Sequence, residues 1–152
     1  MPTRGGGVDG DPLVGFTFRL DVGGKLTGLF LECSGIGSEN EVIDHKVVDT
    51  NGHEMIRKLP GRLKWNDVTL KRGITDDMAI WDWRQEVVEG NMDAARSNCS
   101  IHMLDRQYND VATWNFDLAW PSKVSGPAVK SDSNEIGVEE LIIVHEGLKR
   151  EV

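Results

Sequence analysis

The sequence predicts an α+β fold that is mostly β, with two packed antiparallel sheets forming a small barrel and one flanking helix. Three observations predict it: short segments alternate apolar and polar residues, Gly, Asn and Asp turns separate them, and one segment has helical spacing. With 152 residues, the chain fits one domain with a single core. We expect residues 1–11 to form a flexible N-terminal arm and residues 12–152 to form the barrel domain.

The first strands follow from simple alternation. Residues 14–22 place their aromatic and aliphatic side chains on one face, and Gly23-Gly24 is a tight turn after which residues 25–34 return as a paired strand. Residues 41–49 alternate weakly, with both faces mixed, which favours an edge strand.

Residues 49–61, DTNGHEMIRKLPG, combine turn residues at both ends with apolar Met55, Ile56 and Leu59 between them. They predict a long loop or an extended hairpin, and a loop of this length usually has a function. Residues 62–72 resume strand character with a turn or bulge at Asn66-Asp67.

One helix is predicted over residues 78–89. Asp76 and Asp77 precede it as helix-start residues, Ile80, Trp83 and Val87 recur at helical spacing, and a glycine ends it. We interpret the two aspartates as capping residues rather than an acid–base pair.

The remaining chain returns to β-structure. Strands are expected over 98–105 and 111–120, with Pro121 ending the second, then a loop over 122–135 and a closing strand over 136–146. The closing strand is apolar on both faces, so it is central or covered by a neighbouring subunit. Five side chains are expected together in the core: Phe16, Phe18, Trp114, Phe116 and Leu118.

Charge is unevenly distributed. The net charge is −8, yet residues 1–75 carry ten basic and ten acidic residues, so the second half supplies all of it. A local basic stretch opposed only by Asp67 comprises Arg57, Lys58, Arg62, Lys64, Lys71 and Arg72. The overall negative charge and the lack of interleaved aromatic residues argue against a specific nucleic-acid partner.

No pattern indicates catalysis, a cofactor or a metal site. The four histidines lack ligand spacing, and no nucleophile elbow or phosphate loop is present. Cys33 and Cys99 lie in apparent strands, which favours buried, reduced thiols. The N-terminus has no signal-peptide pattern, and no apolar run is long enough to span a membrane, so we expect synthesis in a cytoplasm without export by the general secretory route.

The five tryptophans are interpreted as core and interface residues rather than as a ligand-stacking platform. Trp81 lies off the apolar stripe of the predicted helix, so we expect it at a subunit contact.

Several phrases, in order, resemble the tail tube family of contractile phage tails and phage-tail-like injection systems: GFTFRLDV, GLFLECSGIGSENEV, KLPGRLKWNDVTLKRGITDD, NCSIHMLDRQYNDVATWNFDLAWPSKV and GVEELIIVHEGL. The resemblance implies a barrel like the type VI secretion tube protein, six-membered rings that stack into a hollow tube, and no catalytic residues. The partners it implies are other copies, contractile sheath subunits, baseplate and spike proteins, and cargo in the lumen. The particle would be synthesised and assembled in the bacterial cytoplasm, and it would be a phage, a released injection particle or a cell-anchored one.

On this resemblance, the 49–61 segment is predicted to leave its own domain and contact the next subunit or ring, and the basic stretch to meet acidic surface of a neighbour. An alternative folds that segment back on its own core. The predicted contact residues are Asp49, Thr50, Asn51, Gly52, His53, Glu54, Met55, Ile56, Arg57, Lys58, Leu59, Lys64, Lys71, Arg72 and Trp81.

Two other functions compete with the main tube subunit. One is a close relative, a baseplate-proximal tube initiator or a secreted type VI-like tube protein. The other is a small β-barrel that binds an apolar ligand between its tryptophans.

Overall fold

The computed structural model describes residues 16–73, 77–126 and 137–151. The predicted N-terminal arm lies outside these residues. The described part contains two helices, α1 (Ala79–Val88) and α2 (Met92–Ala95). Its ten strands are β1 (Thr17–Val22), β2 (Leu26–Phe30), β3 (Glu32–Ser34), β4 (Ser38–Val48), β5 (Glu54–Trp65), β6 (Val68–Gly73), β7 (Ser97–Leu104), β8 (Asp110–Ser125), β9 (Val138–Val144) and β10 (Gly147–Arg150).

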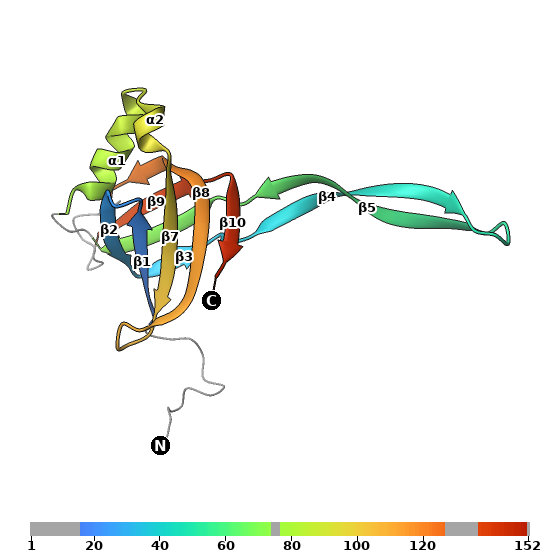
Figure 1. Ribbon diagram of the computed structural model, residues 1–152, viewed down its shortest axis with the longest axis horizontal. Coiled ribbons are helices and arrows are strands. Elements are labelled where there is room, and N and C mark those ends of the chain that lie inside the picture. The colour runs from blue at the N-terminus through green and yellow to red at the C-terminus, as the bar shows by residue number, and fades with distance from the viewer. Residues whose placement is uncertain (1–15, 74–76, 127–136, 152) are drawn as a thin grey trace, which may run out of the picture.

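The strands form two antiparallel sheets of very different kinds. Eight strands form one sheet in the order β2-β1-β7-β8-β9-β6-β3, with β10 added beside β8. Strands β4 and β5 form a separate two-stranded sheet that projects far from the body (Figure 1). The prediction of a mostly β chain with two antiparallel sheets is confirmed, but the second sheet is this projecting hairpin.

The large sheet curls so that its two ends meet. Strands β2 and β3 stand at opposite ends of the sheet, yet only Leu31 separates them along the chain. The Leu31 amide already donates to the Lys71 carbonyl at 2.8 Å, so the chain changes partner strand at this residue. Residues 25–34 are therefore two strands rather than the single one expected. No ladder between β2 and β3 is present among the described strands, so the hydrogen bonding of the sheet stays open at this corner.

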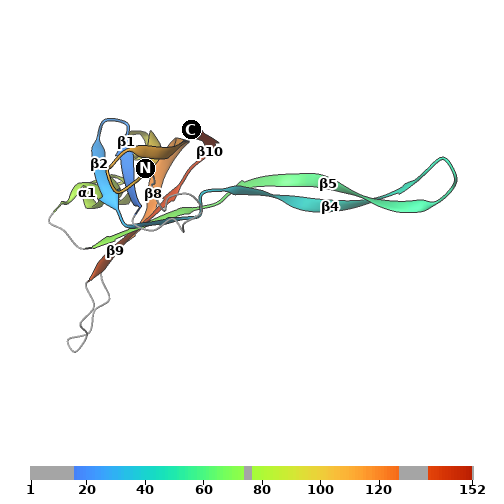
Figure 2. The same cartoon turned by 90° about the horizontal axis from the view of Figure 1, so that it is seen from below.

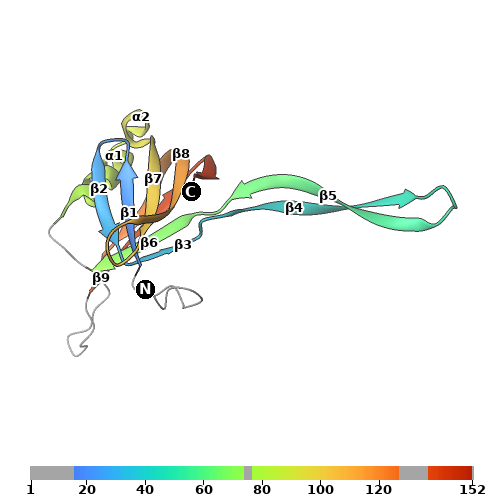
Figure 3. The same cartoon turned by 60° about the horizontal axis from the view of Figure 1, so that its bottom comes forward.

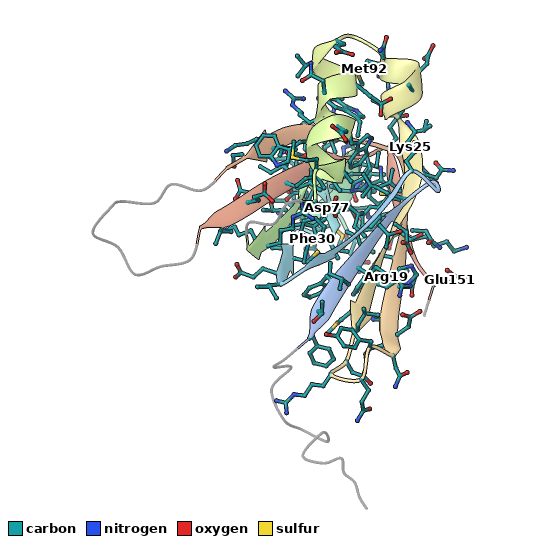
Figure 4. All side chains as sticks on the ribbon, turned by 90° about the vertical axis from the view of Figure 1, so that its left-hand side faces the viewer. Arg19, Lys25, Phe30, Asp77, Met92 and Glu151 are labelled. Atoms are coloured by element: carbon teal, nitrogen blue, oxygen red, sulfur yellow. The ribbon has the colours of Figure 1, made fainter. Side chains whose placement is uncertain are left out.

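The core lies inside the curl and under α1. Figure 4 shows the side chains of the helix and the strands converging there, with Phe30 near their centre. The predicted helix is confirmed, and the Asp77 carboxylate accepts a hydrogen bond from the Ala79 amide at 3.0 Å. Asp76 lies outside the described residues. The short helix α2 and strand β10 were not predicted. The largest fully buried side chains include Trp83, Phe30, Phe116, Leu20, Leu70, Ile80, Ile101, Leu104, Leu141 and Ile143.

The predicted core cluster is correct for Phe116 but wrong for Leu118. Phe116 is 1% exposed, whereas Leu118 is 44% exposed. The pairing of β7 with β8 shifts register here, so that two residues of β8 oppose the single residue Asn98. This bulge reverses the alternation, and Ala119 is buried in place of Leu118. Phe18 and Trp114 are partly buried against the core, and Phe16 is half-buried.

Pro121 does not end β8 as expected. The strand continues to Ser125, and its far half pairs with β9 through a second register shift next to the proline. A proline can sit in a strand at such an irregularity because no ladder bond needs its missing N–H. Strand β9 is central, between β6 and β8, as its apolar faces predicted. None of the described helices is long and apolar enough to cross a membrane.

Candidate assembly surface

The most conspicuous functional feature is the β4–β5 hairpin. Its pairing runs from Ser38 opposite Trp65 to Val48 opposite Glu54, with one register shift after Asn40. Figures 2 and 3 show the hairpin extending away from the body from two further directions. The interpretation of residues 49–61 as part of an extended hairpin is therefore correct, but the hairpin is longer, because it also includes the strand expected at an edge and continues to Trp65.

Asp49 organises the tip of the hairpin through its backbone, which bonds to His53 and Gly52, and through its carboxylate. Asp49 accepts hydrogen bonds from the backbone amides of Asn51 at 2.9 Å and His53 at 2.8 Å. Gly52 adopts a φ of 83°, a conformation that glycine reaches without steric cost. These contacts explain the turn signal that the sequence carries at Asp49-Thr50-Asn51-Gly52.

Apolar side chains lie on both faces of the hairpin. Cross-strand pairs share a face, so Ile43 with Leu59 and Val47 with Met55 line one face. Val42, Val48 and Ile56 line the opposite face, since they alternate with the first set. The exposed fractions are 66% for Val42, 50% for Ile43, 66% for Val48, 51% for Met55, 57% for Ile56 and 37% for Leu59.

The alternative in which residues 49–61 pack on their own core is wrong for this protomer. Met55 and Ile56 are each more than half exposed, and the hairpin points away from the curled sheet. A sheet of only two strands is marginally stable in water when nothing covers either face. Within the protomer, the apolar side chains on both faces of the hairpin therefore stay largely uncovered.

The two chain segments that form the neck of the hairpin lie close to each other. Gly35 has a φ of 86°, and a Cβ at this position would lie 2.0 Å from the Asp67 carbonyl oxygen. On the body side, the ring of His145 packs against Trp65, with centroids 5.8 Å apart, and against Phe116 at 4.9 Å. Sequence reasoning did not identify this contact because His145 shows no ligand spacing and its partners are distant in the chain.

In the structure, some cations of the basic stretch form ion pairs within the protomer and others do not. Lys58 pairs with Asp44 at 2.7 Å on the hairpin itself, and Lys71 lies 3.9 Å from Glu140. Three exposed cations have no ion pair within the described residues: Arg57, Arg62 and Lys64. The expectation of a basic contact surface is thereby reduced to these three side chains, all on β5.

Arg72 requires a correction. Its side chain is 5% exposed, and its Nε donates to the buried Glu139 carboxylate at 3.2 Å. Its Nη2 also donates to the Asp77 carbonyl at 3.0 Å. This guanidinium stabilises its own protomer and offers almost no surface to a partner.

Trp81 is half-buried, and its indole N–H donates to the same Glu139 carboxylate at 2.5 Å. A subunit contact through the remaining ring surface stays a prediction. Trp83 is buried, and its indole donates to the Ala95 carbonyl at 2.7 Å, which joins α1 to α2. The surface has hollows along residues 90–94 and between residues 39–41 and 62–64, and no tryptophan lines either one. The geometry thus gives no support to the ligand-binding alternative.

Both cysteines are free, with Cys99 buried and Cys33 partly buried. Burial raises the pKa of each thiol to about 12, so both stay protonated at neutral pH. The expectation of reduced thiols inside strands is confirmed.

Comparison with known proteins places this geometry among tube proteins. A family model described as T4-like virus tail tube protein gp19 matches residues 14–149. No curated protein sequence matches significantly. One similar solved structure is an extracellular contractile injection system, the PVC sheath–tube complex in its extended state, with 22% identity and a TM-score of 0.71 over 92% of this chain and 91% of that chain.

Two further structures are similar in fold. The tube-terminating cap of the anti-feeding prophage has 19% identity and a TM-score of 0.69, over 92% of this chain and 91% of that chain. Hcp1 from Flavobacterium johnsoniae has 15% identity and a TM-score of 0.56, over 88% of this chain and 94% of that chain.

Proposed function

The chain belongs to the T4-like virus tail tube protein family, and from this premise we propose that it is the main inner-tube subunit of a contractile injection system. Its rings contain six copies and stack into a hollow tube inside a contractile sheath. The role is structural, without catalysis or a cofactor. The single observation that carries this proposal beyond the family is the hairpin, whose two apolar faces are both uncovered in the protomer.

The proposed partners follow the same logic. One similar structure is a sheath–tube complex and another is a baseplate of the anti-feeding prophage, which supports sheath and baseplate proteins as partners. We further propose spike proteins at the tube end and cargo in the lumen. The curled sheet acts as a small barrel in this assembly, and the particle is built in the bacterial cytoplasm before release or anchoring.

The hairpin is the proposed contact between subunits or rings. Burial of apolar surface contributes about 25 cal/mol per Å², and the pairs Ile43–Leu59 and Val47–Met55 offer such surface on one face. Val42, Val48 and Ile56 provide apolar surface on the other face. A hairpin that lies between neighbouring copies therefore buries apolar surface on both faces. The predicted contact residues from Asp49 to Leu59 lie in the tip and in the distal half of β5. We add the distal half of β4 to this proposed contact.

The test shortens the hairpin symmetrically. Residues 44–58 are replaced by a short Gly-Ser linker, so that Ile43 and Leu59 remain the last cross-strand pair. Removing residues 51–58 alone would leave the distal half of β4, residues 44–48, without a partner strand. We expect the protomer to keep its circular dichroism spectrum and thermal melt, because the distal hairpin pairs only with itself. Long tubes should disappear from negative-stain electron micrographs.

The matched control replaces Thr50 and Asn51 by serine, which changes the tip but keeps every apolar side chain of both arms. This control should form tubes of normal length. Normal tubes from the shortened variant would show that the hairpin is not the contact. Monodisperse monomers from the wild-type protein under all assembly conditions would refute the tube assignment itself.

A further inference from the structure

One dipeptide at the tip of the hairpin carries chemistry that the tube function does not use. Asn51 is followed by Gly52, and it is the only asparagine in the sequence that is followed by glycine. Both residues are exposed, in the turn between β4 and β5 at the end of the hairpin that points away from the body (Figure 1). A Cβ added to Gly52 would meet no atom within 4 Å, so this part of the turn is open to solvent.

An asparagine followed by glycine loses its side-chain amide without a catalyst. The backbone nitrogen of Gly52 attacks the Asn51 Cγ atom, the Cγ–Nδ2 bond breaks, and the Gly52 proton leaves with the side-chain nitrogen as ammonia. A succinimide ring results, and one water molecule then opens it to aspartate or isoaspartate. Water is the only co-reactant, and nothing is oxidised or reduced. Glycine favours the attack because it has no side chain that crowds its nitrogen.

The folded turn restrains the attacking nitrogen. The Gly52 amide donates to the Asp49 carbonyl at 3.1 Å, and ring closure has to break this bond because the nitrogen loses its hydrogen. The Asp49 carboxylate fixes the backbone on both sides of this glycine. It accepts from the Asn51 amide at 2.9 Å and from the His53 amide at 2.8 Å. The reaction therefore proceeds from a turn that has opened.

The position of the turn makes such opening accessible from the folded protomer. Local opening at a loop tip costs far less free energy than global unfolding, because few contacts are lost. The last cross-strand pair before the turn is Val48 with Glu54, and both residues are exposed. A two-stranded sheet without a covered face is marginally stable in water. The tip thus combines the reactive dipeptide with a turn that opens while the body stays folded.

We propose that Asn51 is a site of spontaneous deamidation in the free protomer, and that Asp49 sets its rate by holding the turn closed. This chemistry goes beyond the tube function and does not depend on it. Asp49 is a positioning residue, since it acts through the backbone of the turn rather than on the reacting carbon. Its carboxylate slows the reaction by stabilising the closed turn.

Both products alter the tip. Each places a new carboxylate next to the Asp49 carboxylate, which already bonds to the Asn51 amide, and like charges repel. Isoaspartate also inserts an additional carbon into the main chain before Gly52, so the turn bond to the Asp49 carbonyl loses its geometry. The arms of the hairpin then lose the turn that sets their register. If the proposed tube function holds, modified copies assemble less readily than unmodified ones.

The first experiment follows the modification in the protomer itself. Cleavage after Lys46 and Arg57 releases peptide 47–57, in which Asn51 is the only asparagine. Folded, unassembled protein is aged in mildly alkaline buffer, and mass spectrometry with isoaspartate-specific methylation quantifies the two products. A digest of fresh protein gives the background. We expect the products to accumulate in this peptide far faster than in peptides that carry the other asparagines. A peptide 47–57 that stays unmodified throughout ageing would overturn the site.

Variants of Asp49 test the restraint. Asp49→Ala should raise the rate in the native protein several-fold, because the carboxylate bonds to the Asn51 and His53 amides are lost. Thr50→Ala is the matched control: it changes the same tip, keeps all three bonds and should leave the rate unchanged. In urea, wild type and Asp49→Ala should react equally fast, since neither has the turn. Equal native rates for these two, or a difference that persists in urea, would contradict the positioning role.

The second experiment measures the effect on assembly. Partly aged protein is assembled and sedimented, and peptide 47–57 is compared between pellet and supernatant. We expect the pellet to contain several-fold less of the two products, whereas Asn51→Ser, aged in the same way, should assemble as its fresh form does. Equal modification in pellet and supernatant would overturn the effect on assembly. Fresh wild-type protein without rings or tubes would overturn the proposed function and this effect, while the peptide measurement still decides the chemistry at Asn51.

Discussion

Arg72 and Glu139 form a buried ion pair that joins β6 to β9, with Nε and Oε1 3.2 Å apart and the side chains 5% and 4% exposed. The Arg72 guanidinium also lies over the Phe30 ring, 5.4 Å from its centroid, and so contacts the far end of the curled sheet. Through Glu139 the same pair binds the Trp81 indole of α1. One basic residue thus connects the corner where β2, β6, β9 and α1 meet.

Replacing Arg72 by alanine should destabilise the protomer by about 3–5 kcal/mol, because the Glu139 carboxylate would stay buried without its cation. Urea unfolding followed by circular dichroism measures this free energy. The neighbouring, partly exposed pair of Lys71 and Glu140 provides the control: Lys71→Ala should cost less than about 1 kcal/mol. Equal losses for the two variants would show that burial does not govern the Arg72 pair.

Phe116 and Leu118 test the phase reversal at the β8 bulge. Phe116→Ala should cost about 3–5 kcal/mol, the usual cost of truncating a buried aromatic side chain. Leu118→Ala should change the unfolding free energy by no more than about 1 kcal/mol, because its side chain is largely in solvent. A larger loss at Leu118 than at Phe116 would mean that strict alternation, not the bulge, describes this strand.

The three available cations of β5 predict salt-dependent assembly. Replacing Arg57, Arg62 and Lys64 by glutamate should slow tube formation most at low ionic strength, where charges are least screened. Arg72 is left out of this set because its loss would unfold the corner. Light scattering at two salt concentrations follows the rate. The same slowing at both concentrations would remove the electrostatic argument and leave the apolar hairpin contact in place.

Gly35→Ala should destabilise the neck of the hairpin, since the new methyl group would meet the Asp67 carbonyl at 2.0 Å in a φ of 86°. Gly24→Ala separates the two causes: its φ is 77°, but no atom lies within 4 Å of the added carbon. We expect Gly24→Ala to cost about 1 kcal/mol and Gly35→Ala clearly more. Similar melting temperatures for Gly35→Ala and Gly24→Ala would show that the destabilisation comes from the positive φ alone and not from the contact with Asp67.

The thiols predict an alkaline limit of stability. Burial raises the pKa of Cys33 and Cys99 from 9.0 to about 12, so the native state retains protons that the unfolded chain releases. Their contribution is fully present below pH 9 and is lost as pH rises from 9 towards 12. Native protein should therefore react slowly with a thiol reagent at pH 8 and rapidly in urea. Fast reaction of both thiols without denaturant would show that the two strands open readily.

Local sequence patterns were sufficient to predict those helices, strands and turns that depend mainly on residues close together in the chain. Alternation in β1 and the helical spacing of Ile80 and Trp83 each follow the period of one kind of element. The Gly23-Gly24 pair marks a turn, and the apolar residues on both faces of β9 indicate a central strand. The family resemblance on ordered phrases is confirmed by the match over residues 14–149. The turn chemistry around Asp49 also located the tip of the hairpin.

Only the tertiary structure decided where long-range partners fall. Alternation along β8 cannot reveal that Asn98, on another strand, captures the Leu118 amide and reverses the phase. Charge counting cannot distinguish Arg72, which is buried against Glu139, from Lys64, which is exposed, because the difference lies in a residue 67 positions away. No periodic pattern reveals that the backbone of Gly35 lies close to the Asp67 carbonyl at the neck of the hairpin.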